Sequence, residues 1–329
     1  MSWKNRNVMI TGVTGFVGTW LAKELVERGA NVIGFVRDEI PNMPLRTMGI
    51  YDKLAAVPRG DLTDYNSVKR VFSEYEIDTC FHLGAQPIVS IANRNPTLTF
   101  EVNIKGSWNV LEAARTSEKL KSLVIASTDK VYGEPIELPI SEKHLLLANY
   151  PYDASKACME TLARTYFTTY GLPVAITRCC NIYGGADINF SRIIPGTIKS
   201  IFMNQDPVIR SDGTPVRDFI FVKDAVNAYL TLAEQIDKIE VKGEAFNFAN
   251  NNPINMIDLV KKIIEVSGRT DIKPDIQGTR KPDAEIDEQY LTSEKAERVL
   301  GWKPKYTLGG GLKETIEWYE EYFSKFQVN

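Results

Sequence analysis

Short apolar runs alternate with longer amphipathic segments through the first half of this 329-residue chain. The apolar runs predict strands at 7–11, 32–36, about 57–60, 79–83, 123–126 and 174–177. The amphipathic segments predict helices at 16–28, 65–75, 96–117 and 152–170. Because parallel strands must be joined by right-handed crossovers that cover the sheet, this alternation predicts an α/β fold with a doubly wound parallel sheet.

A glycine-rich loop joins the first strand to the first helix. Its sequence is Gly12-Val13-Thr14-Gly15-Phe16-Val17-Gly18. Glycines in this position permit a tight turn and a close approach of a pyrophosphate, while the N-terminus of the helix adds partial positive charge. The loop predicts a Rossmann-type dinucleotide site with contacts from Gly12, Gly15, Phe16, Val17 and Gly18.

The pattern loosens beyond Asn181, where glycines and prolines interrupt the chain. Helices are predicted at 222–233, 256–267 and 312–326, and one strand at 245–248. We therefore expect an NAD(P)-binding Rossmann domain over 1–180, which also receives elements from about 219–249. Residues 181–329 are expected to form mainly a smaller lobe that binds the substrate.

Bulk composition excludes several classes of protein. The formal net charge of −3 gives no basic surface for nucleic acid. No apolar stretch is as long as a membrane span, and the N-terminus has no secretory signal. The four cysteines and two histidines lack the spacing of metal ligands, so no metal site is expected. We expect a cytoplasmic protein with buried, reduced thiols.

The choice of dinucleotide depends on the end of the second strand, where Arg37 and Asp38 stand side by side. Asp38 could bind the ribose hydroxyls of NAD, whereas Arg37 could pair with the additional phosphate of NADP. Both could also be solvated loop charges. Asp61 and Leu62 could contact the adenine ring, although Asp61 could instead cap the following helix. NAD is the preferred cofactor, with NADP as the alternative.

Tyr152 and Lys156 are four residues apart on a predicted helix and therefore share one face. A cation beside a phenol favours the phenolate, which would make Tyr152 a base near neutral pH. Thr128, Asp129 and Lys130 follow the strand at 123–126, where a parallel strand delivers catalytic residues. Asp129 and Lys130 could alternatively be a surface charge pair that shapes a loop.

These motifs together resemble the extended short-chain dehydrogenase/reductases that act on nucleotide sugars. The resemblance is carried by Thr11–Gly18, Asp61-Leu62, His82–Gln86, Asn103–Gly106, Ser127–Gly133, Tyr152–Lys156, Arg178–Gly184, Val216–Asp218 and Ala296–Trp302. Ser127-Thr128-Asp129-Lys130 is most similar to the 4,6-dehydratase branch, and to CDP-glucose 4,6-dehydratases within it. Val216–Ile220 is closer to epimerases and other dehydratases.

The resemblance implies a lyase that removes water from a nucleotide hexose by internal hydride transfer through NAD(P), giving a 4-keto-6-deoxy sugar. It implies catalytic roles for Thr128, Asp129, Lys130, Tyr152 and Lys156. Because Asp129 and Lys130 both follow Thr128 at the strand end, Asp129 is the preferred acid and Lys130 the preferred base, and the reverse assignment stays open. It implies cofactor contacts from Leu83 and Ala85, as well as from Tyr152 and Lys156. It implies substrate contacts from Gln86, Asn181, Arg192, Arg217 and Arg280.

Two other functions remain open at this point. A nucleotide-sugar 4-epimerase would share Thr128, Tyr152 and Lys156 but would need neither Asp129 nor Lys130. A non-catalytic protein that senses NAD(P) would keep the fold without the chemistry. The resemblance also implies a homodimer formed through the helices at 96–117 and 152–170, against the alternative that these helices pack only within one chain.

Overall fold

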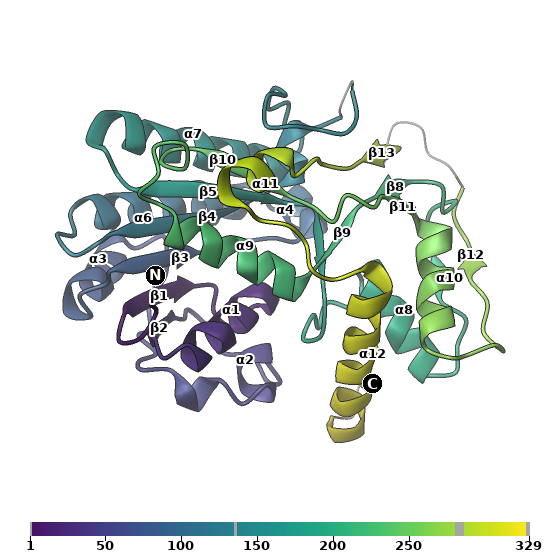
Figure 1. Ribbon diagram of the computed structural model, residues 1–329. Coiled ribbons are helices and arrows are strands. Elements are labelled where there is room, and N and C mark those ends of the chain that lie inside the picture. The colour runs from purple at the N-terminus through teal and green to yellow at the C-terminus, as the bar shows by residue number, and fades with distance from the viewer. Residues whose placement is uncertain (1, 135–136, 280–285, 327–329) are drawn as a thin grey trace.

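A six-stranded parallel sheet with its helices makes up one side of the molecule (Figure 1). The computed structural model describes residues 2–134, 137–279 and 286–326. The strand order is β10-β5-β4-β3-β1-β2. The strands are β1 Asn7–Thr11, β2 Asn31–Phe35, β3 Thr79–His82, β4 Ser122–Thr128, β5 Val174–Cys179 and β10 Ala245–Phe248. This confirms the doubly wound α/β fold, and the switch of strand order between β1 and β3 opens a crevice at the carboxyl ends of the strands.

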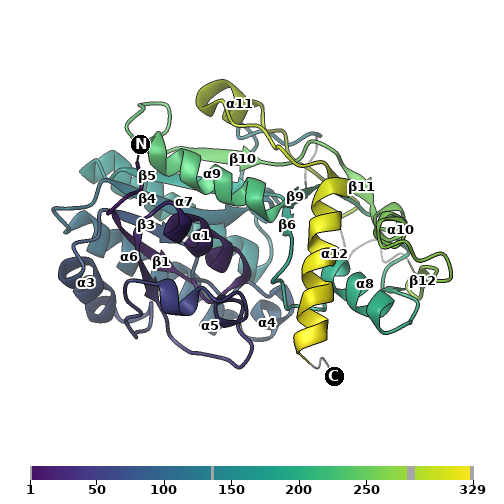
Figure 2. The ribbon, with the colours of Figure 1, turned by 60° about the horizontal axis from the view of Figure 1, so that its bottom comes forward.

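Helices cover both faces of this sheet (Figure 2). On one face α1 (Phe16–Glu27) contacts α9 (Val222–Glu234), and on the other α6 (Gly106–Arg115) packs between α3 (Tyr65–Glu74) and α7 (Pro151–Tyr170). Side chains alternate along β1, since Val8 and Ile10 belong to the core of the first face and Met9 to that of the second. Burial on both faces explains why the strands read as nearly continuous apolar runs.

Two predicted elements differ in the structure. The strand expected at 57–60 is reduced to isolated bridges beside β2, at Ala56 and Arg59, because Pro58 has no N–H to donate. The helix expected at 96–117 is divided into α5 (Pro96–Phe100), a π-helical turn η2 (Glu101–Lys105) and α6. Such π-turns inside helices are frequent at functional sites.

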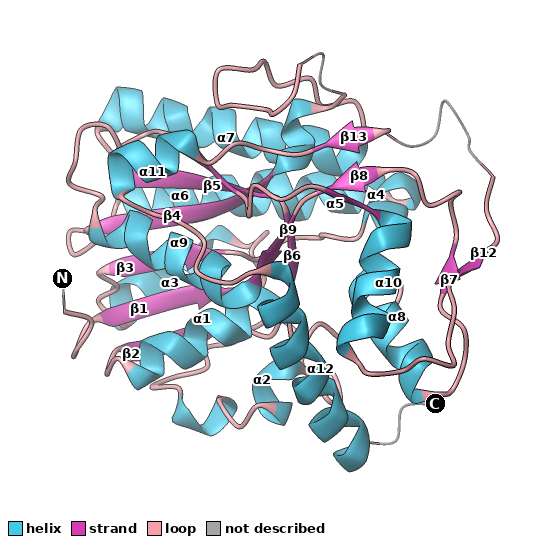
Figure 3. Cartoon of the chain, turned by 45° about the vertical axis from the view of Figure 1, so that its right-hand side comes forward, coloured by secondary structure: helices cyan, strands magenta, loops and turns pink. Residues whose placement is uncertain are grey.

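The C-terminal lobe has a separate apolar core. Its described short strands form one three-stranded sheet and two strand pairs beside the helices (Figure 3). Its helices are α8 Ile193–Phe202, α10 Met256–Val266 and α12 Leu308–Lys325. Its strands are β6 Asn181–Tyr183, β7 Val208–Ile209, β8 Val216–Arg217, β9 Phe219–Phe221, β11 Ile254–Asn255, β12 Asp275–Ile276 and β13 Glu288–Gln289. The helix α11 (Glu294–Leu300) returns to β10, so the chain passes between the sheet and the lobe more than once. The division into two domains near residue 180 stays a prediction.

Short helices complete the described chain. They are α2 Pro44–Thr47, η1 Tyr51–Lys53, α4 Val89–Arg94 and η3 Asp129–Tyr132. Within residues 2–134, 137–279 and 286–326, no helix combines the length and apolarity needed to cross a bilayer.

Candidate active site

A cavity of about 520 Å³ lies between the carboxyl edge of the sheet and the C-terminal lobe. We call it the central cavity. It brings together nine of the residues expected at a site, namely Phe16, Val17, Thr128, Asp129, Lys130, Tyr152, Asn181, Arg192 and Arg217. These residues come from six separate segments of the chain, so their convergence is a product of the fold.

The turn after β4 presents Thr128, Asp129 and Lys130 to this cavity. Thr128 Oγ1 donates a hydrogen bond of 3.0 Å to Asp129 Oδ1, and Lys130 Nζ lies 3.8 Å from the same oxygen. The Asp129 side chain is only 3% exposed, whereas that of Lys130 is 32% exposed. Asp129 Oδ2 is buried without a hydrogen-bond partner among the described residues. The three side chains form one connected group rather than a solvated charge pair.

Tyr152 stands in the first turn of α7 and faces the same cavity. Burial raises the pKa of the Tyr152 phenol above its ordinary value, and the charges of Asp129 and Asp153 raise it further. Arg192 and a hydrogen-bonding interaction with Thr128 lower the Tyr152 pKa. The sequence-based expectation of a lowered Tyr152 pKa therefore differs from the structure, in which burial and two carboxylates raise it.

Lys156 is directed to the strand instead of to the phenol. Its side chain is buried, and Nζ donates a hydrogen bond of 2.7 Å to the main-chain oxygen of Ala126. Burial lowers the pKa of Lys156 to about 8, against an opposing effect of Glu160. Lys156 thus ties the second turn of α7 to β4 just before Thr128, and it holds the strand and the helix in a fixed relation.

The glycine loop has the shape expected for a dinucleotide. Gly12 has a φ of +70°, and a Cβ there would lie 2.8 Å from the nitrogen of Gly84. A Cβ on Gly18 would overlap the carbonyl oxygen of Gly12. Gly15 is exposed at the start of α1, and no side chain caps this helix. The N-terminal N–H groups of α1 are therefore open to an anion.

The other residues expected at the cofactor lie around this loop or at the edge of the sheet. Leu62 packs against Gly84, so it and Leu83 lie close to Gly12. Arg37 and Asp38 pair with each other through Nε and Oδ2 at 2.6 Å and remain mostly exposed. Asp61 accepts hydrogen bonds from Thr63, whereas Asp64 caps α3. The proposed alternative role of Asp61 as that helix cap was wrong.

A polar network connects the loop after β3 with α7. Asn103, in the π-turn, accepts a hydrogen bond from the Gln86 nitrogen at 2.7 Å and donates one to Ser155 Oγ at 2.9 Å. Gln86 Oε1 accepts from the Ile88 nitrogen, so this side chain caps its own loop. Ala85 belongs to the same loop. The roles of Gln86 on the sugar and of Ala85 on the cofactor stay predictions.

A second hollow of about 910 Å³ adjoins the central cavity. The two share Ser191, Arg192, Ile193, Pro215 and Met256. Arg192, at the start of α8, pairs with Asp187 at 2.8 Å and is 43% exposed, so its guanidinium stands at the junction of the two spaces.

The remaining candidates for substrate contacts differ in the hydrogen bonds that they already make within the protein. Asn181 donates from Nδ2 to the main-chain oxygen of Asp218 at 3.3 Å and lines the central cavity. Arg217 lines the cavity too, but its guanidinium donates to the main-chain oxygens of Val216, Ile286 and Asp287. Arg280 lies outside the described residues.

The histidine His82 and the thiol of Cys179 lie near the site but lack the properties of catalytic groups. His82 is buried between Thr11 Oγ1 at 2.7 Å and Ser107 Oγ at 2.9 Å, so both of its ring nitrogens have partners in the core. Burial and the charge of Lys156 lower the His82 pKa to about 3. Burial raises the pKa of Cys179 to about 12. No group of metal-binding side chains occurs in the part of the chain that the structure describes.

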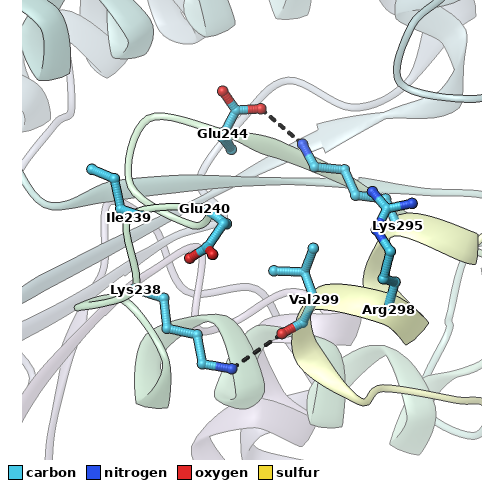
Figure 4. A pocket seen from close by; sticks show the side chains of 7 residues that line it. All are labelled: Lys238, Ile239, Glu240, Glu244, Lys295, Arg298 and Val299. Carbon is cyan, nitrogen blue, oxygen red and sulfur yellow. Dashed lines mark hydrogen bonds and ion pairs between the residues drawn. The ribbon is translucent and has the colours of Figure 1, made fainter.

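A hollow of about 620 Å³ at the opposite edge of the sheet lacks the features of a site (Figure 4). It lies where β10 begins, away from the carboxyl ends of the strands. Its charged groups bind their neighbours, since Lys295 pairs with Glu244 at 2.8 Å and Lys238 donates to the main-chain oxygen of Val299. Arg298 extends into the same hollow.

Two features close to the residues of the central cavity were not found from the sequence. Arg178 and Glu160 form a buried ion pair behind Thr128, and Ser127 donates a hydrogen bond to Glu160. Asp153 is a buried acid directly after Tyr152, and burial raises its pKa to about 6. Its place beside the Tyr-x-x-x-Lys motif was the available signal.

Comparison with known proteins gives consistent matches along the whole chain. The family model of GDP-mannose 4,6 dehydratase matches residues 9–315. A dTDP-D-glucose 4,6-dehydratase of Homo sapiens is 28% identical, over 98% of this chain and 92% of that protein. A CDP-glucose 4,6-dehydratase of Salmonella typhimurium is 27% identical, over 97% of this chain and 91% of that protein.

Solved structures agree with these matches. A UDP-glucose 4-epimerase of Thermotoga maritima with UDP-glucose has a TM-score of 0.87 and 28% identity, covering 96% of this chain and 99% of that one. A dTDP-glucose 4,6-dehydratase of Bacillus anthracis in complex with NAD has a TM-score of 0.83 and 26% identity, covering 98% and 99%. With the glycine loop, the Tyr-x-x-x-Lys helix and the Thr128 turn in one crevice, this chain belongs to the GDP-mannose 4,6 dehydratase family.

Proposed function

We propose that this protein is a nucleotide-sugar 4,6-dehydratase, which converts an NDP-hexose to the NDP-4-keto-6-deoxyhexose through bound NAD. The observation that carries the proposal is the convergence of Thr128, Asp129, Lys130 and Tyr152 on one cavity. A hydroxyl and a phenol suit oxidation at C4, while an acid and an amine suit the loss of water across C5 and C6.

NAD fits the crevice between β1 and β3. The close contact of Gly12 with Gly84 and the uncapped start of α1 would hold its pyrophosphate. When bound, NAD supplies the hydride acceptor needed at C4 and the hydride donor needed at C6. The B. anthracis relative in complex with NAD supports this choice.

Tyr152, Thr128 and Lys156 would serve the oxidation at C4. Tyr152 takes the proton of the 4-hydroxyl as the C4 hydride leaves, while Thr128 holds the 4-oxygen. Because burial and two carboxylates raise the Tyr152 pKa, the site must add positive charge before the phenol acts as a base. Lys156 can supply this positive charge when its ammonium leaves the main-chain oxygen of Ala126 and turns toward the central cavity.

Asp129 and Lys130 would serve the elimination. The 4-ketone acidifies the C5 hydrogen, which Lys130 removes as a proton, while Asp129 protonates the departing C6 hydroxyl so that water leaves. Hydride then adds to C6 and a proton to C5, so that the net change is the loss of one water.

The substrate would span both hollows, with the hexose in the central cavity and the nucleotide in the adjoining 910 Å³ space. Arg192 at their junction is suited to the diphosphate between them, because guanidinium groups bind phosphates bidentately. CDP-glucose was the substrate favoured by the sequence. The relatives named for dTDP-glucose and CDP-glucose are 28% and 27% identical, so identity does not separate these nucleotides.

We also propose a homodimer in the cytoplasm. Apolar side chains stand exposed on the helices expected to pair, with Leu98 at 39%, Trp108 at 43% and Tyr170 at 56%. All four cysteines are free, as a reducing compartment requires. Light scattering at micromolar concentration should give twice the chain mass, and a monomer would contradict the dimer.

One assay tests the reaction. The protein with NAD is incubated separately with CDP-glucose, dTDP-glucose, UDP-N-acetylglucosamine and GDP-mannose, and mass spectrometry follows the loss of one water. We expect loss of water from at least one of them. A product of unchanged mass that is the C4 epimer would instead support a 4-epimerase, which the T. maritima neighbour favours.

Variants at Asp129 and Lys130 separate these two reactions. Replacing both residues with alanine should abolish dehydration while oxidation at C4 continues. Lys130→Arg should be as inactive in dehydration as Lys130→Met, since a guanidinium stays protonated and cannot act as a base. Unaffected formation of the 4-keto-6-deoxy sugar by the double variant would reject these assignments.

A further inference from the structure

Gln289 on β13 is a buried polar residue that reaches from the C-terminal lobe to the turn after β4. Its amide nitrogen Nε2 donates hydrogen bonds to the main-chain oxygen of Gly133 at 3.2 Å and to that of Asp129 at 3.4 Å. The two acceptors lie 156 and 160 positions away along the chain. Gln289 is only 2% exposed, and a buried amide is costly unless it is hydrogen-bonded. These two bonds therefore give the reason for a glutamine at this place.

The two accepting oxygens lie at the two ends of the turn that carries the proposed acid and base. Asp129 is the first residue of η3, and Gly133 directly follows its last residue. Gly133 has a φ of +64°, and a Cβ there would overlap the main-chain oxygen of Leu147, so the chain is tightly confined at this end. One side-chain amide thus holds both ends of the turn from which Asp129 and Lys130 project.

The strand of Gln289 is also bonded to Arg217, a candidate for contact with the substrate. Gln289 is in register with Arg217 where β13 pairs with β8 (Figure 3). The Arg217 guanidinium donates to the main-chain oxygens of Ile286 at 2.6 Å and Asp287 at 3.1 Å, directly before β13. Because Arg217 lines the central cavity, β13 connects the lobe side of this cavity with the turn after β4.

The residues proposed for oxidation at C4 are held by other elements. Thr128 is the last residue of β4 and is in register with Cys179 on β5, inside the central sheet. Tyr152 stands in the first turn of α7. The side-chain bonds of Gln289 reach only the turn that follows Thr128. Loss of these bonds should therefore displace the acid and the base while Thr128 and Tyr152 keep their places.

We propose that Gln289 is a positioning residue, which holds Asp129 and Lys130 at the wall of the central cavity for the elimination of water and joins their turn to the strand pair of Arg217. Gln289 acts through the main chain, because the described residues that line the central cavity and the adjoining hollow do not include it. This inference rests on the proposed dehydratase function, in which Asp129 and Lys130 act after oxidation at C4.

A second glutamine makes the same kind of bond away from the site. Gln235 Nε2, at the end of α9, donates to the main-chain oxygen of Leu300 at 2.9 Å and is partly buried. Leu300 follows Val299, which lines the hollow at the opposite edge of the sheet (Figure 4). Gln235 is therefore a matched control for an amide that supports only the fold.

The test compares Gln289→Met, Gln289→Glu and the control Gln235→Met, each with NAD and the sugar nucleotide that the wild-type protein dehydrates. In a single turnover, the absorbance of reduced nicotinamide measures oxidation at C4, and mass spectrometry measures the loss of water. Both Gln289 variants should lose water at least about tenfold more slowly, because a small displacement of a catalytic group has an effect of this size. Oxidation at C4 should keep the wild-type rate, so reduced nicotinamide accumulates. Gln235→Met should match the wild type in both steps.

Two kinetic results would overturn the proposal. Oxidation and loss of water that slow by the same factor in the Gln289 variants would give Gln289 a role in the fold only. Loss of water at the wild-type rate in both variants would show that the turn does not need the amide. Gln289→Glu keeps the shape of the side chain and replaces its N–H donors with a carboxylate, so it tests the bonds even where Gln289→Met lowers the melting temperature.

Calorimetry with NAD gives a readout that does not depend on turnover. All three variants should bind NAD with the wild-type affinity, since Gln289 bonds only the turn after β4. Weaker binding by the Gln289 variants would contradict the proposal, because the defect would then extend beyond this turn. Failure of the wild type to remove water from any of the four sugar nucleotides is a separate result, which rejects the proposed function itself.

Discussion

Arg178 on β5 and Glu160 on α7 form an ion pair in which each side chain is only 3% exposed. Arg178 Nε donates to Glu160 Oε1 at 3.0 Å, and Arg178 Nη1 donates to the hydroxyl of Tyr132 at 2.7 Å. Ser127, next to Thr128, also donates to Glu160. The pair thus joins the helix that carries Tyr152 to the strand end that carries Thr128.

Glu160→Ala should lower the free energy of unfolding by about 3–5 kcal/mol, because it leaves the Arg178 charge buried and unpaired. Urea unfolding measures this change. Glu74→Ala is the matched control, since Glu74 pairs with Arg70 on the surface of α3, and it should have little effect. Equal stabilities of the two variants would show that the buried pair does not hold α7 in place.

Lys156→Met should stabilise the protein at pH 7 and remove its activity. The folded pKa of Lys156 is about 8, below the ordinary 10.5, so the buried ammonium costs stability at neutral pH. This cost is on the order of 3 kcal/mol below pH 8 and disappears as the pH rises toward 10.5. Unfolding measured between pH 7 and 10 should show the advantage of the variant decreasing with pH. A pH-independent difference would contradict the depressed pKa.

Arg192→Ala should raise KM for the sugar nucleotide at least tenfold with a smaller change in kcat, because a charged hydrogen bond contributes about 1.5–3 kcal/mol. The reason is its place between the two hollows. Arg298→Ala is the control, since Arg298 lines the hollow at the opposite edge of the sheet (Figure 4). Steady-state kinetics that changed equally in both variants would reject the assignment of the diphosphate to Arg192.

Gly12→Ala should abolish binding of NAD, which calorimetry can measure directly. The added Cβ would meet the backbone of Gly84 at 2.8 Å in a residue already at a φ of +70°. Gly49→Ala separates strain from contact, because Gly49 has a φ of +65° with nothing within 4 Å of its Cβ position. It should cost about 1–2 kcal/mol of stability without loss of NAD binding. Normal NAD binding by Gly12→Ala would place the dinucleotide elsewhere.

Local sequence patterns were sufficient to predict the sheet and several residues of the central cavity. The alternation of apolar runs and amphipathic segments determines the doubly wound sheet, because each strand must bury both faces under helices. The glycine loop and the polar residues after β4 are local signals, and a parallel sheet places the carboxyl ends of its strands at one edge. Thr128, Asp129, Lys130 and Tyr152 could therefore be expected together before their cavity was known.

The hydrogen-bond partners of the site residues depend on tertiary contacts that local sequence patterns do not predict. Lys156 was expected beside the phenol, but in the folded chain its amine bonds the main-chain oxygen of Ala126. The expected helix at 96–117 contains a π-turn at Glu101–Lys105, where Asn103 bonds the loop after β3 and the start of α7. These bonds join residues that lie between 17 and 52 positions apart along the chain.

The chain alone determined the fold class and the residue types available for chemistry, because periodicity, glycine spacing and strand ends are local properties. Only the tertiary structure decided that Asp153 is buried, that Arg192 stands between two hollows and that Arg178 pairs with Glu160. Burial and charge pairing are set by residues brought together from separate segments, and these two effects determine which side chains hold or release a proton.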